Sequence, residues 1–236
     1  MPPTTVPPTT MPRTTMPPER AIVFDLDDTL FPEWQYAFSG FDAVSRAFAD
    51  RLGPVEAVAA RMRTLFGTAD RRRVFDVIVA ERGIREGDAL VARMVEAFRG
   101  HRPAIALYSD AVSALNRLRG RCKLGLITDG FSVAQHAKID ALGLRDRLDA
   151  VIVTDDLGRE FWKPHPRSFE VMADMLNVAP DACTYVADNV EKDFVAPNAL
   201  GWDTVWVLRP DSVHADDPVA DGGEPRRTIG SLDELK

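Results

Sequence analysis

Three carboxylates follow the apolar run at residues 21–24: Asp25, Asp27 and Asp28, in the segment FDLDDTL. Like charges this close raise one another's pKa, and burial at a strand end raises them further. Residues two apart in an extended segment point the same way, so Asp25 and Asp27 can reach the same ligand. The segment therefore needs a compensating cation and has the residues for carboxylate chemistry.

Three later apolar runs also end in polar residues. They end in Thr128-Asp129-Gly130, in Thr154-Asp155-Asp156, and at Asp188 with Asp193 five residues on. In an open parallel sheet, ligands bind outside the carboxyl ends of the strands, which meet at one edge. Carboxylates gathered there would repel one another unless a divalent cation or a lysine lay among them. Oxygen ligands with few His or Cys nearby favour Mg²⁺, and Lys163 is the best-placed lysine.

Each of these residues also has a plain structural interpretation. An Asp after a strand is often a turn or helix-capping residue, and this interpretation suits Asp28 best. A single lysine such as Lys163 is usually a surface residue. Four carboxylates, a threonine and a lysine at successive strand exits, in a defined order, favour a functional site.

The elements that must position these residues form an α/β pattern. Residues 33–119 have helical apolar spacing, and short apolar runs alternate with helical segments after Cys122. Such alternation predicts a parallel, Rossmann-like sheet sandwiched by helices, with an all-helical domain inserted after the first strand. Asp70 is expected to cap a helix at 71–83, and Ser109 or Asp110 a helix that ends at Arg119. The predicted strands are Ala21–Asp25, Lys123–Thr128, Ala150–Thr154, Thr184–Ala187, Thr204–Leu208 and a weak Thr228-Ile229; the predicted helices between them are 132–142, 166–177 and 192–200.

The predicted organisation has three parts: a disordered Pro/Thr-rich tail at 1–19, a helical domain at 33–104, and a core from 20–32 and 105–236. The net charge of −7 argues against a nucleic-acid partner. No apolar run reaches 18 residues, and the N-terminus lacks the apolar stretch of a signal peptide. We therefore expect no membrane partner and a cytoplasmic location, as a monomer or a dimer. The two cysteines are expected to be free thiols.

The set of motifs resembles the haloacid dehalogenase superfamily, mostly Mg²⁺-dependent phosphohydrolases. The resemblance covers residues 20 to about 210, and all four motifs occur in order. They are Asp25-Leu26-Asp27-Asp28-Thr29, then Thr128, then Lys163 in FWKPHP, and finally the pair Asp188 and Asp193. Asp129 stands where Asn is frequent in the family and Ala187 where Gly is frequent. We expect the backbone N–H of Asp129, not its carboxylate, to face a ligand.

The resemblance implies a role for each residue. Asp25 is the nucleophile that forms an aspartyl-phosphate, and Asp27 is the general acid and base. Thr128 and the N–H groups of Asp129 and Gly130 bind phosphate, and Lys163 bridges Asp25 and the phosphate. Asp25, the Asp27 carbonyl and Asp188 hold Mg²⁺, with Asp193 in support. Dehalogenases lack an acid at the position of Asp27, so phosphate-ester chemistry is favoured over dehalogenation.

The helical insertion resembles the type 1 cap of the superfamily, which closes over the site and contacts the leaving group. It contains twelve Arg and no Lys; Arg71-Arg72-Arg73 either reaches an anionic leaving group or is a solvated helix face. The leading hypothesis is a phosphatase for a small phosphorylated metabolite, such as a sugar, nucleotide or hydroxy-acid phosphate. A phosphomutase and an inactive binding module on the same scaffold remain open alternatives.

Overall fold

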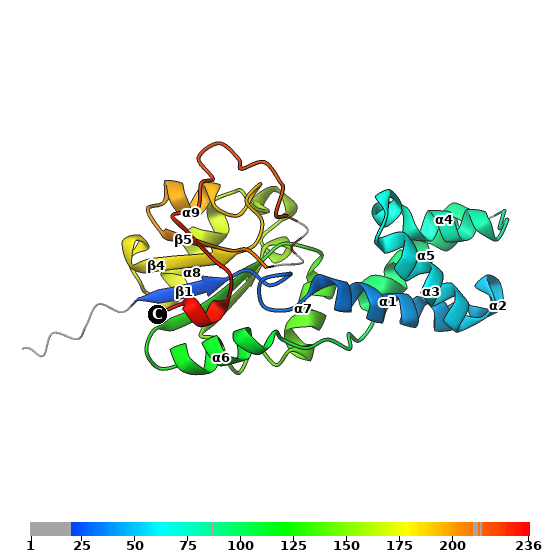
Figure 1. Ribbon diagram of the computed structural model, residues 1–236, viewed down its shortest axis with the longest axis horizontal. Helices are drawn as coiled ribbons and strands as arrows, with labels where there is room; N and C mark the ends of the chain where they lie inside the picture. Colours follow the sequence, from blue (N-terminus) through cyan, green and yellow to red (C-terminus); the bar gives the residue numbers. More distant parts are fainter. Residues whose placement is uncertain (1–19, 86, 210–211, 213) are drawn as a thin grey trace, which may run out of the picture.

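The computed structural model describes residues 20–85, 87–209, 212 and 214–236. The Pro/Thr-rich segment 1–19, predicted as a disordered tail, lies outside the described residues. The described chain contains a six-stranded sheet in the order β3-β2-β1-β4-β5-β6, in which every pair of neighbours is parallel (Figure 1). The strands are β1 (Ala21–Phe24), β2 (Lys123–Thr128), β3 (Ala150–Val153), β4 (Cys183–Ala187), β5 (Asp203–Val207) and β6 (Arg227–Ile229).

The sheet is covered on both faces, which explains why its strands are apolar runs rather than alternating ones. Alternate residues of β1 contribute to two separate apolar clusters: Ile22 and Phe24 pack with the α6 and α7 side, and Ala21 and Val23 with the α8 and α9 side. The covering helices are α6 (Ser109–Leu118), α7 (Ser132–Ala141), α8 (Arg167–Leu176) and α9 (Val195–Ala199). The predicted Rossmann-like α/β architecture is confirmed.

A block of helices follows β1 and extends away from the sheet (Figure 1). Its buried residues form a third apolar cluster, in which Phe41, Met62 and Met94 are almost fully enclosed. The helices are α1 (Glu33–Ala47), α2 (Ala49–Leu52), α3 (Val55–Phe66), the 3-10 helix η1 (Ala69–Arg73), α4 (Val74–Glu81) and α5 (Gly87–Gly100). The division of the chain into domains at 33 and 104 stays a prediction.

Two of the expected helix caps are wrong. Thr68, not Asp70, caps the turn before α4: its hydroxyl accepts a hydrogen bond from the Asp70 amide. The Asp110 carboxylate does not cap α6 either. It accepts hydrogen bonds from Arg209, Ser231 and the Leu232 amide, and so ties α6 to the C-terminal segment. Thr68 is a local cap two residues before Asp70, whereas Asp110 is held by long-range partners that no local pattern reveals.

The remaining small elements are short 3-10 helices: η2 (Thr154–Asp156), η3 (Arg159–Phe161), η4 (Pro180–Ala182) and η5 (Leu232–Glu234). Within the described residues, no helix is both long and apolar enough to cross a membrane. Cys122 and Cys183 are both free thiols, as expected.

Candidate active site

The carboxylates of the first and fourth motifs meet where the strand order reverses. The chain runs from β1 outward through β2 to β3, then returns to place β4 on the other side of β1. Asp25 directly follows β1, and its amide donates to the carbonyl of Val186 in β4 at 2.9 Å. Asp188 directly follows β4. Such a switch point is the usual ligand-binding crevice of open parallel sheets.

Lys163 lies at the centre of this crevice, in the loop after η3. Its side chain has no exposed surface. The ammonium Nζ lies 2.6 Å from Asp25 Oδ1 and 2.7 Å from Asp193 Oδ1, and it donates to the Tyr185 hydroxyl at 3.0 Å. An ammonium group has three hydrogens, and these three partners surround it. The lysine therefore joins β1, β4 and the segment after β4.

Three buried carboxylates lie together beside this lysine, which forms ion pairs with two of them. Asp25, Asp188 and Asp193 each offer an oxygen within 4.8 Å of the other two. Asp188 Oδ1 accepts a long hydrogen bond of 3.5 Å from Thr29, and Asp188 Oδ2 is buried without a hydrogen-bond partner among the described residues. An unsatisfied charged oxygen in a buried site is costly. The donor set therefore fits a hard divalent cation, which would satisfy this oxygen and reduce the repulsion.

The pKa values of these groups reflect the same excess of negative charge. Burial raises the pKa of Asp25 to about 7, against the opposing attraction of Lys163. Burial, together with Asp25 and Asp193, raises the pKa of Asp188 well above its usual range. Burial alone would lower the pKa of Lys163, but the two carboxylates beside it raise it well above normal, so the lysine stays charged. Lys192 also lowers the pKa of Asp25, but the two lysines do not offset the burial, so the crevice retains an excess of negative charge.

The Thr128-Asp129-Gly130 segment forms the turn between β2 and α7. Gly130 has φ of +134°, a backbone conformation that favours glycine, and a Cβ atom there would also lie 3.0 Å from the Gln135 side chain. The Asp129 carboxylate accepts from Thr154 at 2.7 Å and from the Lys163 amide at 3.2 Å. Its Oδ1 is thus engaged by the protein, and the expectation that the backbone N–H of Asp129 faces a ligand stays a prediction.

Asp27 has two partners that we did not predict, both on α7. Lys138 Nζ lies 2.7 and 2.9 Å from the two Asp27 oxygens, and Gln135 Nε2 donates to Asp27 at 3.0 Å and to Thr128 Oγ1 at 2.5 Å. The Lys138 side chain is only 6% exposed. One signal could have found them: two polar residues three apart share a helix face, on the helix that follows the turn.

Lys138 also connects Asp27 with the helical block. Its Nζ lies 4.4 Å from the ring centre of Tyr36 in α1. The Tyr36 hydroxyl in turn donates to the carbonyl of Phe98 at 3.3 Å, near the end of α5. A single chain of contacts therefore runs from Asp27 to the two helices through which the chain enters and leaves the block.

Asp28 and the third strand exit have structural roles in the described contacts. Asp28 has φ of +53°, and its carboxylate accepts from the amide of Glu33, the first residue of α1, at 2.8 Å. Asp155 accepts from the Ser132 amide at the start of α7, and Asp156 pairs with His136 at 2.8 Å. Neither Asp155 nor Asp156 joins the carboxylate cluster around Lys163.

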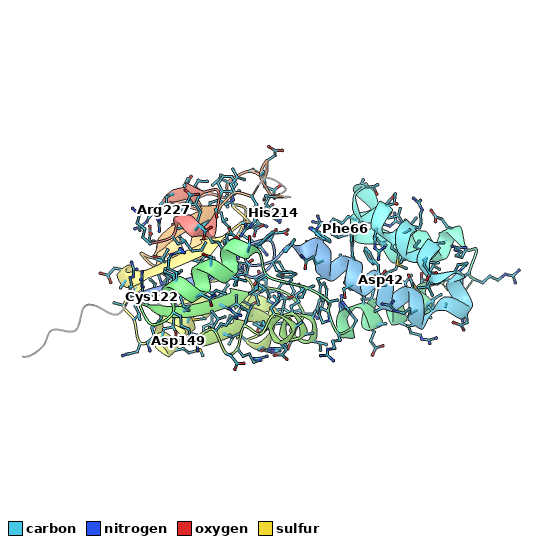
Figure 2. All side chains as sticks on the ribbon, turned by 60° about the horizontal axis from the view of Figure 1, so that its bottom comes forward. Asp42, Phe66, Cys122, Asp149, His214 and Arg227 are labelled. Carbon is cyan, nitrogen blue, oxygen red and sulfur yellow. The ribbon has the colours of Figure 1, made fainter. Side chains whose placement is uncertain are left out.

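Two cavities open onto these residues. A small one of about 150 Å³ is lined by Asp25, Asp188, Asp193 and their neighbours. A larger one of about 800 Å³ lies between the sheet edge and the helical block, and both Asp27 and Gly130 line it. Phe66 of the block and His214 of the α/β part are also among its lining residues, and both are labelled in Figure 2. This volume is typical of a small-molecule site.

Comparison with known proteins gives a consistent result. A family model described as haloacid dehalogenase-like hydrolase matches residues 19–201. A glyceraldehyde 3-phosphate phosphatase from Methanopyrus kandleri is 30% identical over 199 residues, which is 80% of this chain and 84% of that protein. A phosphoserine phosphatase from Thermus thermophilus is 32% identical over 167 residues, 70% of this chain and 63% of that protein.

The fold has close counterparts among solved structures. The HAD-hydrolase YfnB from Bacillus subtilis superposes with a TM-score of 0.65 at 22% identity, over 93% of this chain and 97% of that one. A HAD-superfamily hydrolase of subfamily IA from Geobacter sulfurreducens also has a TM-score of 0.65, at 18% identity, over 92% of this chain and 94% of that one. At these identities the likeness concerns the fold.

The cluster around Lys163 predicts a specific pattern of stability. We expect Lys163→Met to lower the free energy of unfolding by about 3 to 5 kcal/mol at pH 8, because buried carboxylates then lack their cation. Asp25→Asn should not destabilise the protein at this pH. Its carboxyl has a raised pKa in the folded state, so the charge it carries above about pH 7 opposes folding.

Urea denaturation of the metal-free protein measures both changes. Lys123→Met is the matched control, because Lys123 lies at the start of β2, is partly exposed and pairs with Asp149 at 3.9 Å, away from the cluster. Similar losses for Lys163→Met and Lys123→Met would show that the buried lysine has no special role in stability.

Proposed function

Because the chain belongs to the haloacid dehalogenase-like hydrolases and is a phosphoric monoester hydrolase, we propose that it acts through an aspartyl-phosphate on Asp25. The substrate is the phosphate ester of a small metabolite. The observation that carries the proposal is the position of Asp25: a carboxylate at the switch point, 2.6 Å from a buried lysine and open to a cavity. A covalent intermediate divides a difficult hydrolysis into two easier steps.

In the first step an Asp25 oxygen attacks phosphorus, and the ester oxygen leaves with the pair of electrons of the broken P–O bond. Lys163 favours the charged form of the Asp25 carboxylate and orients it. The Thr128 hydroxyl and the N–H groups of Asp129 and Gly130 would bind the equatorial phosphate oxygens, where negative charge is spread in the transition state. The start of α7 adds its dipole to this binding.

Asp27 would donate a proton to the leaving oxygen and then take one from the water that attacks the aspartyl-phosphate. Its contacts with Gln135 and Lys138 hold its carboxyl group at the edge of the larger cavity, where the leaving group would lie. The second step forms a bond from the water oxygen to phosphorus and breaks the bond between phosphorus and the Asp25 oxygen, which restores the carboxylate. Inorganic phosphate and an alcohol are the products.

Asp25, the backbone carbonyl of Asp27 and Asp188 are the proposed ligands of Mg²⁺, with Asp193 in a supporting position. Three mutually close carboxylate oxygens, one of them without a partner, suit an ion that prefers oxygen ligands. When bound, Mg²⁺ would shield the anionic nucleophile from the anionic ester and polarise the phosphoryl group.

Asp25→Asn tests the proposed function. We expect the variant to fold and to release no inorganic phosphate above background from a library of phosphorylated metabolites, because an amide is a poor nucleophile. The wild type should release phosphate from at least one member. Asp174→Asn, on an exposed position of α8, is the control and should keep full activity. Near-wild-type turnover by Asp25→Asn would contradict the assignment, and transfer without free phosphate would indicate a mutase.

The metal proposal predicts a pH-dependent stabilisation. We expect Mg²⁺ to raise Tm more at pH 8 than at pH 5.5, because the raised pKa values of Asp25 and Asp188 leave protons on these ligands at the lower pH. Differential scanning fluorimetry with and without Mg²⁺ measures the shift. Asp188→Asn should lose it, while Asp174→Asn keeps it. Full phosphatase activity in excess EDTA, or an equal shift at both pH values, would contradict the proposal.

Lys138 should act as a positioning residue for Asp27. We expect Lys138→Met to lower kcat by about ten- to a hundredfold on alkyl phosphates, below the 10²–10⁴-fold that general acid–base catalysis contributes. The rate of the first-step burst of nitrophenolate from p-nitrophenyl phosphate should fall much less, because nitrophenolate leaves without a proton. Lys138→Arg, which keeps the charge, should recover part of the loss. Equal losses on both substrates would indicate a general structural role instead.

A further inference from the structure

Arg99, in the last turn of α5, packs beside the Thr128–Gly130 turn, which is the proposed phosphate site. Its guanidinium carbon lies 3.4 Å from the ring centre of Phe131, which is the residue directly after Gly130. The side chain is half-buried and lines the larger cavity together with Asp27 and Gly130. A cation from the helical block therefore lies beside the position proposed for the substrate phosphate.

The charges that line this cavity make Arg99 distinctive. The Lys and Arg residues that line the larger cavity are Arg71, Arg72, Arg99 and Lys138. Arg71 forms an ion pair with Glu33, and Lys138 with Asp27. Arg72 is exposed on η1. Arg99 is half-buried and, within the described part of the chain, has no carboxylate at ion-pair distance.

A guanidinium stacked on an aromatic ring is well prepared to bind an anion. The ring contact orients its plane and leaves the N–H groups at its edge available, in a fork that matches a carboxylate. Phe131 also has Arg159 at 4.7 Å from its ring centre, but Arg159 is already paired with Asp155 at 3.5 Å. Of the two arginines at this ring, only Arg99 lines the cavity.

We propose that Arg99 binds a carboxylate on the leaving group, so that the preferred substrates are phosphate esters of small hydroxy acids. This inference rests on the phosphatase function proposed above. The phosphate would lie at the Thr128–Gly130 turn and the carboxylate at Arg99, with the ester oxygen facing Asp27 between them. Among sugar, nucleotide and hydroxy-acid phosphates, the half-buried cation without an acidic partner favours the last class.

Two matched pairs of esters test the proposal, each differing by a carboxylate: 3-phosphoglycerate with glycerol 3-phosphate, and O-phosphoserine with phosphoethanolamine. We expect the wild type to have the higher kcat/KM for the acid in at least one pair. Arg99→Gln should raise KM for that acid by about ten- to a hundredfold, the loss expected when a hydrogen bond to a charged group is removed. The rise in KM for the matched ester without a carboxylate should be much smaller. Arg99→Lys should raise the KM for the acid by an intermediate amount.

Arg72→Gln is the control, because it removes a cation that lines the same cavity but is exposed. It should leave the preference within each pair unchanged. Preference of the wild type for the esters without a carboxylate, or equal losses on both members of a pair in Arg99→Gln, would overturn the proposal. If the wild type hydrolyses none of the four esters but cleaves p-nitrophenyl phosphate, the phosphatase function holds and the carboxylate site is wrong. No hydrolysis of any ester would overturn both.

Discussion

The ion pair between Lys163 and the carboxylates of Asp25 and Asp193 is the interaction on which the rest of the site depends. It lies in a crevice where none of the lysine side chain is exposed. Taking charges out of water costs several kcal/mol per ion, and attraction between partners offsets this only in good geometry. One lysine does not balance three carboxylates, as the raised pKa values of Asp25 and Asp188 show. The remaining negative charge favours the binding of a cation. It also makes the folded protein less stable than it would be with a neutral crevice.

The parallel sheet is what brings these charges together. Residues distant in the sequence become neighbours because β1 and β4 are adjacent and both end at the same edge. Apolar clusters on both faces bury the strands and hold their register. The helical block then faces this edge, and its contacts reach the site through Tyr36 to Lys138 and through Arg99 to Phe131. The sheet edge that carries the charged cluster and the helical block thus line one cavity from opposite sides.

Much of this was predictable from the sequence. Apolar runs alternating with helical segments predicted the parallel sheet, and the pattern from Asp25 to Asp193 predicted which side chains meet. Local patterns failed where a long-range partner decides a role. Asp110 looked like a helix cap but binds the C-terminal segment. Lys138 belongs to no motif of the sequence, yet it is buried against Asp27. Arg99 was one of twelve arginines, and only the fold places it on Phe131.

We propose that Asp25 carries the phosphoryl group during turnover. Rapid acid quenching of the enzyme with a substrate, followed by proteolysis and mass spectrometry, tests it directly, because acyl phosphates survive in acid and are cleaved by hydroxylamine. We expect one phosphoryl group on the peptide that contains Asp25, removed by hydroxylamine and absent from Asp25→Asn. A label on another residue, or product formation in a single turnover with no labelled enzyme at any quench time, would contradict it.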